Sequence, residues 1–152
     1  MNHRWIYPPA IFVFACFALL GAGYVEAKPP LVVSVESPYG MKKTVSNIKE
    51  SLESNNFRFL REQSLKEGLG GENPDFRVLY FCNFAIANEA LEYEKRIGFM
   101  LPCKVTLIRK EGKVTIHYLN PSAVKNISNR HLNGLCDRIT LSLKNLVEEA
   151  IL

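Results

Sequence analysis

The sequence lacks the motifs that identify several large classes of protein. It has no Cys-x-x-Cys-His segment, which excludes covalent attachment of a c-type haem, and no zinc-finger spacing of cysteines. It contains neither His-Glu-x-x-His nor Gly-x-Ser-x-Gly, and no serine stands beside an evident base. Because no acid–base or nucleophile constellation is present, we expect a binding or accessory protein rather than a self-sufficient enzyme.

Concentrated charge of one sign is also missing. The chain has 19 Lys and Arg against 15 Asp and Glu, a net charge of +4, and its cations are scattered along the sequence. Nucleic-acid binding requires cations gathered on one face or along one helix, so we expect no nucleic-acid partner. With 47% hydrophobic and 22% charged residues, the composition is that of an ordinary globular protein, and residues 28–152 have the length of one domain.

The long hydrophobic run that the sequence does have stands at its start. Arg4 precedes the apolar stretch Ala10–Ala22, and Val25-Glu26-Ala27 resembles a cleavage site. This pattern predicts a secretory signal peptide over residues 1–27. The stretch is shorter than the roughly 20 residues that span a bilayer. We therefore expect a periplasmic or secreted protein with no stable membrane span after cleavage.

Hydrophobic periodicity in residues 28–152 predicts the order strand, helix, strand, strand, helix, strand, strand, helix. The expected strands are Leu31–Glu36, Phe57–Glu62, Arg77–Cys82, Cys103–Arg109 and Lys113–Tyr118, and the expected helices run from Ser37-Pro38 through Leu52, over Phe84–Lys95 and over Leu132–Ala150. Strands joined by hairpins with helices between them indicate the α+β class: a mostly antiparallel, five-stranded sheet with helices packed on one face. An open sheet has exposed edge strands, so a homodimer is also possible.

Three short segments together resemble a known family. They are Cys82-Asn83 at the end of an apolar strand, Ile97–Cys103 (IGFMLPC) and Tyr118–Pro121 (YLNP) after a hairpin. In this combination the sequence is similar to the domain of unknown function 302 family, over roughly Val33 to Leu146. The resemblance implies a compact α/β domain, frequent in bacteria and often exported, and it implies no established activity.

The cysteines offer the most specific chemistry. Cys136 lies on the apolar stripe of the last helix, where a small buried hydrophobe is expected. Cys82 ends one strand and Cys103 begins the next, so the two lie close together if these strands are antiparallel neighbours. We expect a structural disulfide, because exported proteins meet an oxidising compartment and bridged Cα atoms must lie within about 7 Å.

Two alternatives use the same cysteines. A redox-active or sulfur-handling thiol pair needs a nearby positive charge, which Lys104 supplies. A haem or copper site would use Cys82 or Cys103 with His117 or Met100. Our first interpretation therefore includes neither a metal nor a cofactor, because the sequence lacks the ligand spacing of a dedicated metal site.

Three polar residues mark a candidate pocket near the cysteines. Asn83 follows Cys82, while Tyr118 and Asn120 end the hairpin that Cys103 begins. One hypothesis is that Asn83, Tyr118 and Asn120 line a small pocket with the cysteines. The interpretation we favour is that both asparagines form Asx turns at strand ends.

Overall fold

A computed structural model describes residues 28–65, 75–123 and 130–152; the predicted signal peptide lies outside these ranges. One antiparallel sheet has the strand order β1-β5-β4-β3-β2. Its strands are β1 (Val32–Ser37), β2 (Arg58–Ser64), β3 (Asp75–Cys82), β4 (Cys103–Lys110) and β5 (Lys113–Leu119). The predicted α+β class and five-stranded antiparallel sheet are confirmed.

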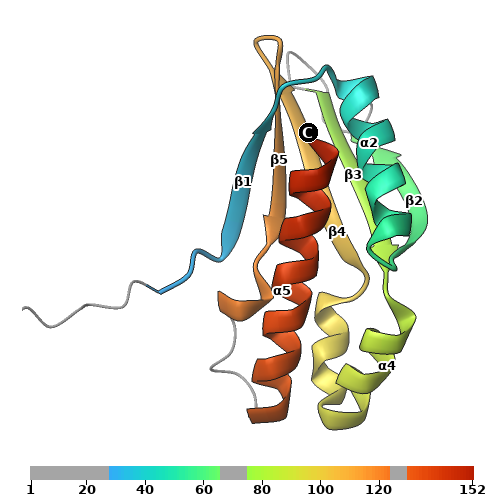
Figure 1. The fold of residues 1–152 in the computed structure, drawn as a ribbon, viewed down its shortest axis with the longest axis vertical. Coiled ribbons are helices and arrows are strands. Elements are labelled where there is room, and N and C mark those ends of the chain that lie inside the picture. The colour runs from blue at the N-terminus through green and yellow to red at the C-terminus, as the bar shows by residue number, and fades with distance from the viewer. Residues whose placement is uncertain (1–27, 66–74, 124–129) are drawn as a thin grey trace, which may run out of the picture.

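The helices lie on one face of this sheet and beyond one of its ends (Figure 1). Helices α2 (Met41–Ser54) and α5 (Arg130–Ala150) cross the same face side by side. Helix α4 (Phe84–Tyr93) and the 3-10 helix η1 (Lys95–Met100) extend past the end of β3 and pack along the N-terminal half of α5. No helix in the described ranges is long and apolar enough to cross a membrane.

The main core lies between the sheet and the helices α2 and α5. Side chains alternate between the two faces of a strand, and the apolar residues that alternate along β4 and β5 are buried. These are Val105, Leu107, Val114, Ile116 and Tyr118. They pack with apolar residues on the inner faces of α2 and α5, such as Ile48, Leu52, Leu143 and Leu146. The helical stripe predicted near the C-terminus therefore contacts the sheet, as its periodicity indicated.

The start of α2 differs from the prediction. The sequence Ser37-Pro38 suggested a capping residue followed by a first helical proline, but the helix begins at Met41, with Gly40 at the N-cap position. The Ser37 Oγ is instead 2.7 Å from the Thr44 Oγ1, in the first turn of the helix. Ser37 is the last residue of β1 and pairs with Val114, so sheet pairing holds it in an extended conformation that delays the helix.

The hairpin between β4 and β5 turns on Glu111 and Gly112. Both have positive φ, 51° and 82°, which matches the two-residue turn that suits the twist of an antiparallel pair. The sequence Lys110-Glu111-Gly112, with glycine at its end, is typical of such a turn. The turn fixes the register in which Lys110 pairs with Lys113, and so sets which residues of β4 and β5 point toward the helices.

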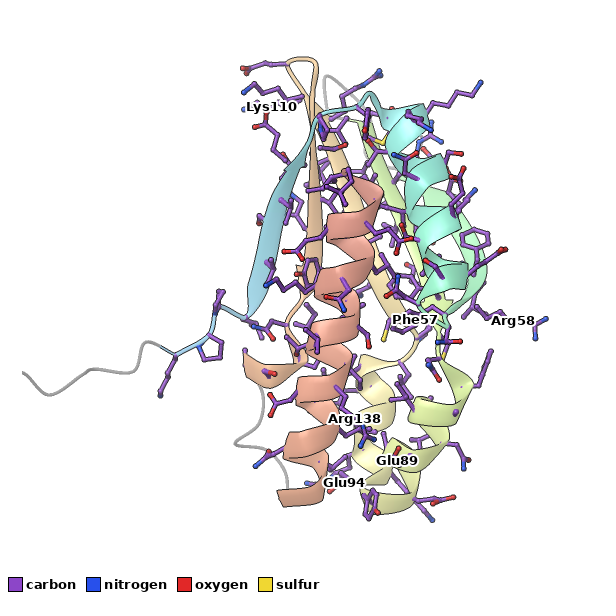
Figure 2. All side chains as sticks on the ribbon, in the orientation of Figure 1. Phe57, Arg58, Glu89, Glu94, Lys110 and Arg138 are labelled. Atoms are coloured by element: carbon purple, nitrogen blue, oxygen red, sulfur yellow. The ribbon has the colours of Figure 1, made fainter. Side chains whose placement is uncertain are left out.

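A second, smaller core holds α4 and η1 against α5. Ala90, Leu132 and Leu135 are its buried members, with Ile86 and Ile97 packed against them. At the surface, the Arg138 Nη2 donates to both carboxylate oxygens of Glu89 at 2.7 and 2.8 Å (Figure 2). This part of the molecule is thus a separate layer beyond the end of the sheet, and a space remains between the two cores.

Candidate functional site

An apolar pocket lies where the end of the sheet meets α4, η1 and α5. Its volume is about 400 Å³. Apolar side chains dominate its wall: Phe57 before β2, Ala87 and Ala90 on α4, Met100 and Leu101 at the end of η1, and Leu135, Ile139 and Leu143 on α5. Figure 2 shows Phe57 at the end of the sheet, near the start of α4. The pocket is a gap between the main core and the second core.

Four sulfur-containing side chains line this pocket. Cys82 ends β3, Cys103 begins β4, Met100 ends η1 and Cys136 lies on α5. Because β3 and β4 are antiparallel neighbours, residues that are far apart in the sequence reach the same end of the sheet. The predicted orientation of the two strands therefore brings Cys82 and Cys103 to one site.

The expected disulfide is not found. Cys82 and Cys103 are free thiols, and no cysteines in the described residues lie at disulfide distance. The register explains this difference, because Cys103 pairs with Phe81 rather than with Cys82. Successive residues on a strand project to opposite faces, so a one-residue offset turns the two side chains apart.

The environment of the thiols keeps them protonated. Burial raises the pKa of the Cys82 thiol above its ordinary value. Burial, with a smaller contribution from neighbouring Cys82, raises the pKa of the Cys103 thiol to about 11. The thiolate is the reactive form of cysteine, so this pocket does not activate either residue as a nucleophile at neutral pH.

The three polar residues predicted for the pocket are not all in its wall. Asn83 lines it, but its side chain also caps α4 by accepting a hydrogen bond from the Ile86 N–H at 3.1 Å. Tyr118 and Asn120 are absent from the lining, although their neighbours Leu119 and Pro121 belong to it. The structure brings Asn83 to the cysteines and leaves Tyr118 and Asn120 behind the wall.

Tyr118 and Asn120 have other contacts. Burial and the charge of Glu148 raise the pKa of Tyr118, which packs in the main core. The buried Asn120 Oδ1 accepts from the Ser122 N–H and the Thr140 Oγ1, both at 3.1 Å. Asn120 therefore forms an Asx-type turn and links the end of β5 to α5.

The remaining candidate ligand lies elsewhere in the fold. His117 is on β5, where its Nδ1 is 2.8 Å from the Ser34 Oγ on β1, and it is not part of the pocket lining. Met100 does line the pocket. Within the described residues, no group of three or more His, Cys, Asp or Glu side chains could hold a metal ion.

Sequence reasoning missed most of the pocket wall. Leu135, Cys136 and Ile139 were predicted as one stripe of core residues, but the same stripe closes the pocket from α5. Phe99, within the segment Ile97–Cys103, also lines the pocket, although it stays 73% exposed. Periodicity identifies an apolar helix face, but it does not show whether neighbouring elements fill the space opposite that face.

Comparison with known proteins gives matches at the level of family and fold. Residues 33–150 match the family model described as "Domain of unknown function DUF302". The chain is also similar to the crystal structure of an uncharacterized conserved protein DUF302 from Bacillus stearothermophilus. The TM-score is 0.74 at 23% sequence identity, over 80% of this chain and 99% of that chain. No curated protein matches the sequence.

Proposed function

The chain belongs to the DUF302 family, and from this premise we propose that it is a binding protein for a small, largely apolar ligand. The observation that carries the proposal is the pocket of about 400 Å³ between the two cores. Ligand pockets commonly measure roughly 300–1,000 Å³ and are lined mainly by apolar side chains. Protein interiors otherwise contain few voids larger than a water molecule.

The polar groups of the wall favour binding over catalysis. The raised pKa values of Cys82 and Cys103 leave both thiols neutral at pH 7, so they add polarizable, weakly polar surface to the pocket. Asn83 is already engaged as the helix cap of α4. A wall of this chemistry holds a ligand by burying its apolar surface, which contributes about 25 cal/mol for each Å² removed from water.

Two alanines on α4 allow a matched test. Ala87 is buried in the pocket wall, whereas Ala85 is exposed on the same helix. We expect Ala87→Leu to fill the pocket and to weaken binding of the neutral, environment-sensitive dye Nile red by about tenfold or more, while Ala85→Leu leaves binding unchanged. Thermal unfolding of both variants checks that the fold is kept.

A second substitution repeats this test from the next turn of α4. Ala90 is 3% exposed and also lines the pocket, so Ala90→Leu should weaken dye binding in the same way. If both pocket variants fold and still bind Nile red like the wild type, the pocket is not the binding site and the proposal fails.

We propose further that the protein works in the periplasm or is secreted. The support is the pattern of the first 27 residues, in which a cation, an apolar stretch and a cleavage-site pattern follow one another. Sequencing of the N-terminus of protein isolated from its producing cells should give Lys28 as the first residue. An N-terminus at Met1 or Asn2 in that protein would contradict export with cleavage.

A second candidate function uses the sulfur-containing side chains. Cys82, Cys103 and Met100 line one pocket, and either cysteine with Met100 would supply a thiolate and a thioether, the soft ligands that copper(I) prefers. Copper(I) titration and a visible spectrum after addition of haem test this candidate directly. A stoichiometric copper(I) complex that is lost in Cys103→Ser would favour a metal site over an apolar ligand. A haem Soret band that is lost in the same variant would favour a haem site.

A further inference from the structure

A row of cations crosses the outer face of the sheet beside the pocket. In the β2–β3–β4 register Arg61 pairs with Tyr80, and Tyr80 pairs with Lys104. The Arg61 guanidinium lies 4.3 Å from the centroid of the Tyr80 ring. Arg58 precedes Arg61 on β2, and Figure 2 shows the Arg58 side chain extending away from the body of the protein.

Within the part of the chain that the structure describes, these cations have no carboxylate partner. Other charged residues of the sheet are paired, such as Arg77 with Glu62 at 2.9 Å and Lys113 with Glu36 at 3.3 Å. Arg58, Arg61 and Lys104 form no salt bridge within the described residues, which leaves a local excess of positive charge. Such an excess attracts an anionic group, and the attraction is weakened by salt.

The row meets the pocket at Tyr80 and Lys104, which are both part of the pocket lining. Cys103 packs against the main core, whereas Lys104 is exposed. Since successive residues on β4 project to opposite faces, the pocket wall reaches from the interior to the outer face of the sheet. The apolar wall and the unpaired cations thus belong to one continuous surface.

We propose that the ligand of this pocket is an amphiphile with an apolar body and an anionic head group, a carboxylate or a phosphate, held at Lys104, with Arg61 on the far side of Tyr80 adding positive charge. This inference rests on the proposed function and specifies its ligand class. Lys104 supplies a flexible ammonium group on an apolar stem, and the guanidinium of Arg61 is always charged and attracts either anion. The apolar body occupies the space lined by α4 and α5.

Calorimetric titration of the purified protein tests the head group with three ligands of equal chain length, kept below their micelle-forming concentrations. Dodecanoate and dodecyl phosphate supply the two anions, and 1-dodecanol supplies the same apolar chain without charge. We expect both anions to bind about tenfold more tightly than dodecanol, and this advantage to decrease as salt is raised. The ratio between the two anions shows whether the site prefers a carboxylate or a phosphate.

Lys104→Gln should weaken binding of the anions about tenfold and leave dodecanol binding unchanged. Lys43→Gln is the matched control, because Lys43 is exposed on α2 and lies outside the pocket lining. Equal affinities for all three ligands, or an anion affinity insensitive to Lys104→Gln, would overturn the head-group inference while leaving the apolar pocket intact. Absence of binding for all three ligands and for Nile red would instead overturn the proposed function.

Discussion

Cys103 lies directly opposite Phe81 in the pairing of β4 with β3. This register has two consequences for the site. It brings Cys103 to the end of the sheet where Cys82 also lies, and it offsets the two cysteines by one residue. The protein therefore gains a pocket with two neighbouring thiols instead of a covalent link between its strands.

The first prediction concerns the reactivity of Cys103. Because its pKa is raised from 9.0 to about 11, iodoacetamide should modify it slowly at pH 8 in the folded protein, and the rate should rise until the pH passes about 11. Mass spectrometry of timed samples measures this rate, with urea-unfolded protein as the control. Rapid modification of folded protein at pH 7 would show that the thiol is activated after all.

The same shift predicts how stability depends on alkaline pH. A folded-state pKa above the unfolded value favours the protonated folded form, so the stabilisation is fully present below about pH 9 and is lost as the pH rises through about 11. Urea unfolding at a series of pH values should show this decline in the wild type and a smaller one in Cys103→Ala. Parallel curves for the two proteins would contradict the assignment to Cys103.

The second prediction compares two phenylalanines. Phe81 is fully buried and its ring meets Phe57 edge-on, with centroids 5.3 Å apart. Phe81→Ala should therefore lower the free energy of unfolding by about 3–5 kcal/mol. Phe84→Ala, at a position 56% exposed, should change it by no more than about 0.5 kcal/mol. Denaturant unfolding measures both, and similar losses in the two variants would contradict the placement of Phe81 in the core.

The third prediction compares two glycines that have open space around them. An added Cβ would meet nothing within 4 Å at Gly112 or at Gly134. Gly112 has φ of +82° in the hairpin turn, so Gly112→Ala should destabilise the protein by about 1 kcal/mol through backbone strain. Gly134 lies inside α5, where Gly134→Ala should stabilise it by about 0.5–1 kcal/mol. Opposite shifts of the melting temperature are the expected result.

The fourth prediction concerns Glu62, which lies between two cations. Its Oε2 is 2.9 Å from the Lys49 Nζ, and its Oε1 is 2.9 Å from the Arg77 Nη1. The hydrogen bond from Lys49 and the neighbouring Arg77 hold the pKa of Glu62 below its ordinary value of 4.5. Since the carboxylate is partly exposed, Glu62→Gln should cost about 0.5–1 kcal/mol at pH 7.

The pH dependence of this cost follows from the sign of the shift. A lowered folded-state pKa stabilises the fold above the unfolded value of 4.5, and this contribution is lost as the pH falls through the lower folded-state value. The difference between wild type and Glu62→Gln should therefore shrink in acid. Glu53→Gln, an exposed change on α2, is the control, and a difference that persists below pH 2 would contradict the assignment.

Most of the fold could be predicted from local patterns. The alternation in Cys103–Arg109 and Lys113–Tyr118 and the helical stripe ending at Ala150 are periodic signals, and burial follows them, with Ile139 partly buried. The errors lie at element boundaries. The start of α2 moved because Ser37 stays in the sheet, and the predicted helix Phe84–Lys95 ends at Tyr93 before continuing as η1.

The pocket was less predictable than the fold. The sequence indicated Cys82, Cys103 and Asn83 because they stand at the ends of elements, and these three residues do meet. Asn120 had the same kind of signal but is engaged by Ser122 and Thr140 instead. A polar residue at a strand end must find a hydrogen-bond partner there. The sequence does not show which partner the fold supplies.

The amino-acid sequence by itself determined the period of each element and the hairpin at Glu111-Gly112, because these depend on residues near one another along the chain. The same patterns indicated an antiparallel sheet with one covered face. Only the tertiary structure decided that Cys103 faces Phe81, that α5 leaves a space against α4, and that Lys104 borders this space. Those features depend on the register between strands and on the distance between packed layers, which are set when segments far apart in the chain come together.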